Sequence, residues 1–237
     1  MVLLSGKRKA DIIIEVANGG KSVSFTSENK GIKTDGLDRF AVKELEVSGC
    51  FVEDFSFLSA LPNVEKLIIL DCKSDAWQRI PIHENIRILR LHTLRNMKTY
   101  HDNVDFITGF PNIEYLYLNN LDIEKFPNTS HLKKLLVVCC SLRKCTDYST
   151  LENAPSLSTF IGWSAVDRHR TAAETFIPIL NNPSLKAFSY TQAFNIENRK
   201  LDEYIRTHRP DITYPMVTTR NGDVDISKIM VFINMFF

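Results

Sequence analysis

A six-residue pattern of apolar positions recurs along most of the chain. Its first, fourth and sixth positions are apolar, as in residues 42–47 and 64–69, and successive copies begin 19 to 28 residues apart. The first positions are Val42, Val64, Ile86, Ile113, Leu132, Leu157 and Leu185, with a weaker copy at Ile212. Self-similarity at this period is typical of stacked units that each contribute one strand. The pattern therefore predicts about seven repeats over residues 41–216.

The segments that flank these repeats follow other patterns. Residues 11–26 contain two runs rich in β-branched residues around an Asn-Gly-Gly sequence, which favours a hairpin turn. Residues 217–226 repeat this arrangement around Asn-Gly, and residues 229–237 are almost wholly apolar. The outermost units of a stack need a cover for their apolar ends. We therefore expect β-rich caps at 1–40 and 217–237.

The copy at residues 113–123 has the clearest spacing of apolar positions. It has the sequence Ile-Glu-Tyr-Leu-Tyr-Leu-Asn-Asn-Leu-Asp-Ile, and the ninth positions of three other copies are Cys50, Cys72 and Cys140. This pattern resembles the leucine-rich repeat family, whose motif LxxLxLxxN/CxL has Asn or Cys at the ninth position. The resemblance covers residues 42–215. It implies an α/β solenoid with a curved parallel sheet on its concave side and mixed helices and turns on its convex side.

The cysteines have a structural interpretation in this register. In the leucine-rich repeat family the ninth side chain turns inward and satisfies backbone groups, which a small buried cysteine can do. The common nucleotide-binding, phosphate-binding and hydrolase motifs do not occur in the sequence. A thiol or metal site at Cys139, Cys140 and Cys145 is the weaker interpretation, so we expect no metal and no cofactor.

The concave face has an unusual composition. Side chains alternate across a strand, so the third, fifth and seventh positions of each copy should point outward. A solvated sheet face is polar, whereas many of these positions are aromatic or aliphatic. The outward positions that we predict to bind a partner are Ile68, Leu70, Arg90, His92, Tyr115, Tyr117, Asn119, Leu136, Val138, Ile161 and Trp163.

Three interpretations of this apolar face remain open. The first is a partner-binding patch in which Tyr115, Tyr117 and Trp163 are the anchors, because Tyr and Trp are frequent at binding hot spots. In the second, the apolar tail of the chain or a second copy covers the face, which would make a homodimer through that face or the tail. The third is an error of register in the later repeats.

Composition and charge narrow the class of partner. The chain has 237 residues and a formal net charge of +1, without the basic stripe of a nucleic-acid binder. It has no apolar stretch of about 18 residues that would cross a membrane. Its five cysteines are an odd number without a CxxC pair, which favours a reducing, cytoplasmic location.

These observations lead to one expected function and one alternative. We expect a non-catalytic protein that recognises another protein through the concave face, either as an adaptor or as a stoichiometric inhibitor of the immunity-protein type. Extended concave surfaces of repeat proteins serve such binding. The alternative from a different class is an enzyme with an unfamiliar site around Arg90 and His92, since histidine can act as an acid or a base near neutral pH.

Overall fold

The computed structural model describes residues 13–17, 22–26, 42–49, 52, 54–93, 104–142, 144–163, 171–191 and 195–213. The chain forms two compact units, unit 1 (Met1–Ile113) and unit 2 (Glu114–Phe237). Both contain parallel strands and short helices, so the expected α/β class is confirmed. The cap expected at 217–237 and most of the cap expected at 1–40 lie outside the described residues.

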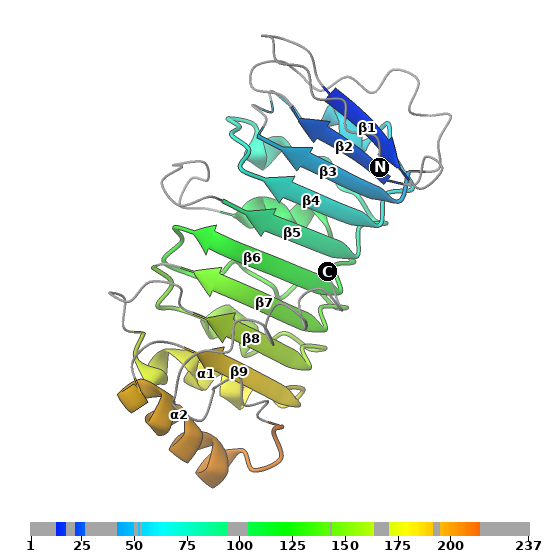
Figure 1. Ribbon diagram of the computed structural model, residues 1–237. Coiled ribbons are helices and arrows are strands. Elements are labelled where there is room, and N and C mark those ends of the chain that lie inside the picture. The colour runs from blue at the N-terminus through cyan, green and yellow to red at the C-terminus, as the bar shows by residue number, and fades with distance from the viewer. Residues whose placement is uncertain are drawn as a thin grey trace. The chain divides into compact units, whose positions relative to one another are not determined.

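The described part of unit 1 contains five strands in chain order (Figure 1). Strands β1 (Ile13–Ala17) and β2 (Ser22–Thr26) are antiparallel. Strands β3 (Glu44–Ser48), β4 (Lys66–Leu70) and β5 (Ile88–His92) then follow β2 in parallel. The connections carry the 3₁₀ helices η2 (Ser56–Leu58), η3 (Trp77–Arg79) and η4 (Asp105–Gly109). In register, Glu44 pairs with Lys66 and Lys66 with Ile88, so equivalent positions advance by the same interval from strand to strand.

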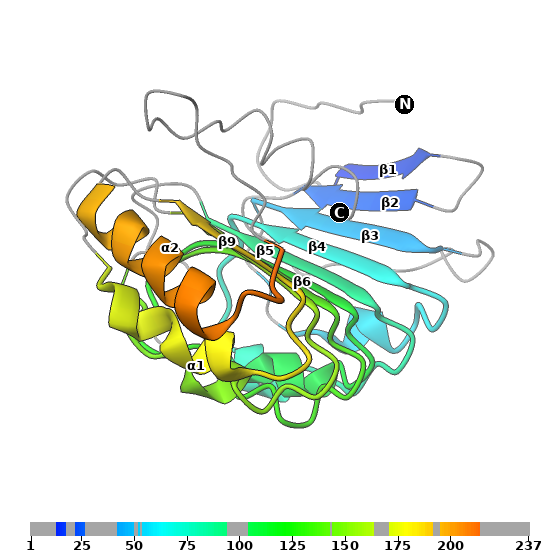
Figure 2. The same cartoon turned by 90° about the horizontal axis from the view of Figure 1, so that it is seen from below.

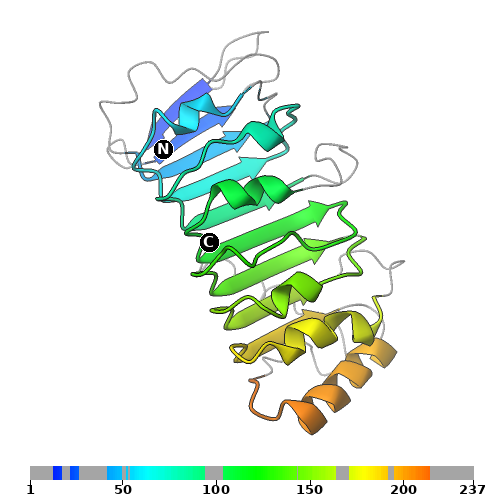
Figure 3. The same ribbon diagram turned by 180° about the vertical axis from the view of Figure 1, so that it is seen from behind.

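Unit 2, where it is described, contains four parallel strands, also in chain order (Figure 1). These are β6 (Tyr115–Leu121), β7 (Val137–Leu142), β8 (Thr159–Trp163) and β9 (Ala187–Thr191). The connections carry η5 (Ser149–Leu151), η6 (Ala173–Phe176) and α1 (Ile177–Asn181), and the longer α2 (Asn195–His208) follows β9. Within each unit the 3₁₀ helices and α1 lie on one face of the sheet, which we call the inward face (Figures 2 and 3).

The strands β3, β4 and β5 alternate between buried and partly exposed residues, as the apolar pattern predicts. In β3, Leu45 and Val47 are buried on the inward face, while Glu44, Glu46 and Ser48 are only half-buried. The same alternation recurs in β4 and β5. We call the opposite side of each sheet, which carries the third, fifth and seventh positions, the outward face.

Aromatic side chains fill the space between the inward face and the connections. In unit 1, the rings of Phe55 and Trp77 are 5.0 Å apart, and Trp77 stacks on Phe106 at 4.8 Å. In unit 2, Phe160 stacks on Phe188 at 5.5 Å. Phe55, Phe160 and Phe188 are fully buried, and burying one such side chain stabilises a fold by about 1.5–3 kcal/mol. Each core is therefore built from residues of successive connections and strands in contact.

Several of the parallel strands end in a sharp turn. Among the described residues, the eighth position has a positive φ angle in three copies: Gly49 (63°), Asp71 (53°) and Asn120 (58°). Gly, Asp and Asn tolerate this left-handed conformation better than other residues. The turn directs the ninth residue inward. At Cys72 the sulfur lies 3.3 Å from the carbonyl oxygens of both Val47 and Leu70, which is the role that the resemblance implies for this position.

Polar side chains just before the strands link each segment to the preceding one. They occupy the position before the first apolar residue and donate a hydrogen bond to a backbone carbonyl of the previous copy. Within the described ranges these bonds are Asn85 Nδ2 to Pro62 O (2.8 Å), Asn112 Nδ2 to Glu84 O (2.8 Å), Ser156 Oγ to Lys133 O (2.7 Å) and Ser184 Oγ to Pro155 O (2.7 Å). Three of these donors follow a proline in the sequence. The Pro-Asn and Pro-Ser pairs thus mark a recurring link as well as a turn.

The predicted register of β7 is wrong and must be moved from Leu132 to Leu135. Val137 pairs with Tyr115 on one side and with Thr159 on the other, so Leu135, and not Leu132, corresponds to Ile113. Both leucines are fully buried, and the shift places one apolar residue where another was expected. The apolar spacing is therefore compatible with a copy that begins at Leu132 and with one that begins at Leu135. With the observed register the first positions fall at 113, 135 and 157, which are evenly spaced.

This shift corrects three predictions. Val138 is buried on the inward face instead of lying on the outward face, and Leu136 precedes the strand, with 36% of its surface exposed. Cys140 pairs with Leu118 and Gly162, so it is a sixth-position core residue and not a ninth-position one. Its neighbour Cys139 occupies the fifth position and lies on the outward face, as do Val137 and Ser141.

A glycine and a tyrosine share one space in the core of unit 2. The sixth positions of the four described strands align as Leu118, Cys140, Gly162 and Tyr190. A Cβ atom on Gly162 would lie only 2.6 Å from Cδ2 of Tyr190. The buried Tyr190 ring packs at 4.1 Å from Phe176, and its hydroxyl donates to Thr171 Oγ1 at 3.2 Å. Tyr190 thus occupies the volume that a side chain on β8 would otherwise fill.

We expect Gly162→Ala to lower the free energy of unfolding by about 1–3 kcal/mol, because the added methyl group overpacks this site. Chemical denaturation of the variant would measure the loss. Tyr190→Leu vacates part of the same volume, so the double variant should lose less than the sum of the two single losses. Additive losses would show that Gly162 and Tyr190 do not share the space.

One arginine holds the last described residues to unit 2. The Arg209 guanidinium donates to the carbonyl oxygens of Leu180, of Asn182 at 3.0 Å and of Leu185 at 3.0 Å. It also pairs with Asp211 at 2.9 Å, and this hydrogen bond lowers the pKa of the aspartate. The carbonyls lie at and beyond the C-terminal end of α1, where backbone acceptors have no partner within the helix. Arg209 therefore supplies hydrogen-bond donors to the backbone carbonyls at the C-terminal end of α1.

We expect Arg209→Ala to lower the free energy of unfolding by about 1.5–3 kcal/mol, the usual range for hydrogen bonds from a charged group. Arg209→Lys keeps the charge but loses the planar fork, so it should recover less than half of that loss. Arg206→Ala, in the exposed last turn of α2, is the matched control and should change stability by no more than about 0.5 kcal/mol. Equal losses at both arginines would contradict the role of Arg209.

Candidate recognition face

The outward face of unit 1 presents apolar residues between charged ones. Three rows cross β3, β4 and β5 in register, and all of their side chains are half-buried. The rows are Glu44–Lys66–Ile88, Glu46–Ile68–Arg90 and Ser48–Leu70–His92. Lys66 Nζ lies 3.6 Å from Glu44 Oε1. The predicted residues Ile68, Leu70, Arg90 and His92 thus lie together on two adjacent strands.

His92 is held in its neutral form by its surroundings. Partial burial of the imidazole is the largest cause that lowers its pKa below the usual value of 6.5. The nearby Arg90 guanidinium lowers the pKa further, whereas the Asp71 carboxylate opposes the shift. Around pH 7 the outward face of unit 1 therefore carries a neutral imidazole beside charges of both signs, those of Lys66 and Arg90 and those of Glu44 and Glu46.

At its centre, the outward face of unit 2 is more buried than the outward face of unit 1. Tyr115, Asn119 and Trp163 are half-buried, but Tyr117 is only 3% exposed and Ile161 only 4%. The Tyr117 and Trp163 rings are 6.1 Å apart although their strands are separated by β7. The outward residues of β7 at these two levels, Cys139 and Ser141, are both small. The prediction placed Tyr117, Ile161 and Trp163 on the correct face, but it did not foresee that two of them are buried.

Two buried thiols of unit 2, those of Cys140 and Cys145, are unsuited to nucleophilic or redox chemistry. Burial is the main cause that raises the pKa of Cys140 well above its usual value, and it raises the pKa of Cys145 to about 12. The adjacent Tyr148 hydroxyl is also buried, which raises its own pKa. Thiols are reactive as thiolates, so these groups stay protonated and inert near pH 7. Within the described ranges no group of three or more His, Cys, Asp or Glu residues is placed to hold a metal ion.

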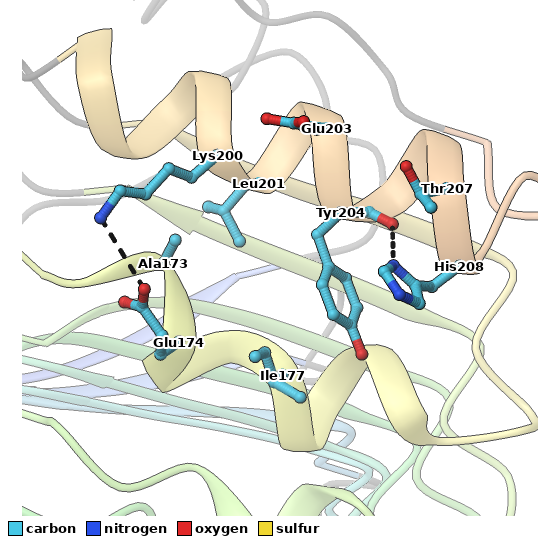
Figure 4. Close-up of a pocket in the computed structure, with 9 residues that line it drawn as sticks. All are labelled: Ala173, Glu174, Ile177, Lys200, Leu201, Glu203, Tyr204, Thr207 and His208. Carbon is cyan, nitrogen blue, oxygen red and sulfur yellow. Dashed lines mark hydrogen bonds and ion pairs between the residues drawn. The ribbon is translucent and has the colours of Figure 1, made fainter.

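A hollow of about 340 Å³ lies between α2 and the η6–α1 segment of unit 2 (Figure 4). Sequence reasoning did not anticipate it. One of its charged groups is paired with two carboxylates: Lys200 Nζ lies 3.7 Å from Glu174 Oε1, across the hollow, and 3.3 Å from Glu197 Oε1. Tyr204 stacks on His208 at 4.4 Å. The Lys200–Glu174 pair and the hydrogen bond from Ala173 N to Glu197 Oε2 (2.9 Å) connect α2 to the preceding segment, and we assign the hollow no ligand.

Comparisons with known proteins do not identify a family. No model of a known protein family matches the chain, and no curated protein matches it. In the part of the chain that the structure describes, no helix is both long and apolar enough to span a membrane. A functional assignment therefore depends on the residues of the outward faces.

We expect the NMR titration of His92 to give a pKa below 6.5. Because the folded value lies below the unfolded one, protonation favours the unfolded chain, and this residue lowers stability as the pH falls through about 6.5. His92→Gln should therefore reduce the difference in stability between pH 7 and pH 5. Asp71→Asn removes the opposing carboxylate and should lower the pKa of His92 further. A value above 6.5 in the unaltered protein would contradict the burial argument.

Proposed function

We propose that this chain is a leucine-rich-repeat solenoid that recognises another protein through the outward face of unit 1, without catalysis of its own. Three features support the solenoid. Neighbouring strands of the repeats are parallel and in chain order, and their equivalent positions advance evenly, as at 44, 66 and 88 or at 115, 137 and 159. The connections return over the inward face (Figure 2). A left-handed eighth residue and an inward ninth residue recur as in the motif.

The observation that carries the proposed binding is the half-buried apolar cluster of Ile68, Leu70 and Ile88 beside Arg90. Apolar groups rimmed by polar groups are typical of protein interfaces. Arginine is also enriched among the residues that contribute most to binding energy. The predicted aromatic anchors lie in unit 2, where Tyr117 is buried, so the accessible residues of unit 1 are the better candidates.

The proposed partner is a protein, and both expected roles fit this face. An adaptor would hold its partner in a larger assembly, whereas a stoichiometric inhibitor would block a partner's active site at a ratio of one to one. The enzyme alternative is supported by one observation, a partly exposed and neutral His92 beside Arg90, since a general base must be deprotonated at the working pH. A hydrolase screen with the unaltered protein and His92→Ala would detect it.

We expect Ile68→Asp and Arg90→Glu each to weaken binding of the partner by about 30-fold or more, the effect of losing a hot-spot residue of at least about 2 kcal/mol. The partner would be captured from a lysate of the source organism, identified and purified, and its Kd measured for each variant. Gln78→Asp, exposed on η3 at the connections of the same unit, is the control and should bind normally. Normal binding by both outward-face variants would contradict the proposal.

A further inference from the structure

A row of buried residues crosses the outward face of unit 2. Tyr117, Cys139, Ile161 and Ser189 align in register on β6 to β9, and their exposed fractions are 3%, 0%, 4% and 2%. We call these four residues the buried row. Cys139 and Ser189 are small enough to be hidden by larger neighbours. Tyr117 and Ile161 are large side chains on the face opposite to the core, and their burial needs a cause.

Unit 1 supplies a matched comparison. Ile68 occupies in β4 the same fifth position that Ile161 occupies in β8, and both strands have parallel neighbours on each side. Ile68 is half-buried, whereas Ile161 is buried. The neighbours of Ile68 in register, Glu46 and Arg90, are longer than Cys139 and Ser189, yet they leave it accessible. The neighbours of Ile161 within the row are therefore too short to account for its burial, and Trp163, the next outward residue of β8, is itself only half-buried.

The other described elements of unit 2 do not lie over this row. The 3₁₀ helices and α1 pack on the inward face, and α2 packs against η6 and α1 beyond the edge of the sheet (Figures 2 and 4). The described part of the chain ends at Thr213, which forms a parallel bridge with Ala187 of β9. The chain thus leaves this point at the edge strand of the same sheet, with residues 214–237 still to follow.

We infer that the apolar end of the chain, within residues 214–237, covers the buried row. Residues 229–237 contain one polar side chain, Asn234, among apolar ones that include Phe232, Phe236 and Phe237. Roughly eight extended residues reach roughly 26 Å, whereas four strands at roughly 4.8 Å spacing span about 14 Å. The segment is long enough to cross the row, and burial of aromatic side chains on both sides would stabilise the contact.

The reactivity of the Cys139 thiol reports whether the buried row is covered, and other cysteines of the chain serve as controls. It lies on the outward face, whereas its neighbour Cys140 and the distant Cys72 are buried on the inward side. We expect iodoacetamide to modify Cys139 at least about tenfold faster in a variant that ends at Lys228 than in the full chain, since removal of a cover raises access to the thiol. Cys72 should stay unmodified in both, and Cys139→Ser should abolish the fast reaction. Peptide mass spectrometry locates the label.

Equally slow modification of Cys139 in both proteins, with Cys72 protected, would overturn the inference. If the shortened chain unfolds, Cys72 will react as well, and a second measurement on the full chain then decides. With p-benzoylphenylalanine in place of Tyr117, irradiation should link position 117 to a peptide of residues 214–237 in the same chain. A link to a second copy or to another segment would overturn the inference. Neither measurement needs a partner, so its result is independent of the proposed function.

Discussion

Within each unit, the inward residues of neighbouring strands are held at the same level because the strands pair in register. Leu45, Leu67 and Leu89 are one such level, and Val47, Ile69 and Leu91 are the next. All of them are buried, so each strand depends on its neighbours to keep its apolar side chains from water. A short strand has few apolar contacts of its own, and its stability comes from this shared layer. Equivalent positions advance by 22 residues from β3 to β5 and from β6 to β8, and by 28 from β8 to β9, so connections of different length return the chain to the same register.

The same constraint explains where the polar groups are placed. A turn that packs on a core leaves backbone carbonyls without partners, and an unsatisfied buried group costs about 1–3 kcal/mol. Asn85, Asn112, Ser156 and Ser184 satisfy carbonyls of the preceding copy at one end of the strands, and Cys72 does so at the other end. Arg209 donates to three backbone carbonyls of the connection between β8 and β9. These links are local, so each segment is fixed mainly by the one before it.

The sequence was sufficient to predict what depends on this repeating layer. The α/β class, the strands at 44–48, 66–70 and 88–92 and the side on which their residues point all follow from apolar spacing. β7 was misplaced because Leu132 and Leu135 both fit the spacing and because cysteine at 140 was not counted as a sixth-position core residue. The Pro-Asn and Pro-Ser pairs that precede the strands, and the Gly, Asp or Asn at the eighth position, were visible signals whose hydrogen bonds and φ angles only the structure shows. Burial of Tyr117 and Ile161 could not be predicted, because alternation along a strand gives the face of a residue and not what lies over that face.

The two outward faces differ in a way that affects binding. The half-buried Ile68 and Arg90 are accessible without any rearrangement, so an interaction there gains its full contact energy. At the buried row a partner would first have to displace whatever covers Tyr117 and Ile161. Its apparent Kd would then be the intrinsic Kd divided by the fraction of molecules in which the row is uncovered. If that fraction is about 1%, the apparent Kd rises by about 100-fold. The same displacement would expose an apolar tail segment, which is itself costly in water. For these reasons the apolar composition of unit 2 is better explained by an internal contact, and that of unit 1 by recognition of a partner.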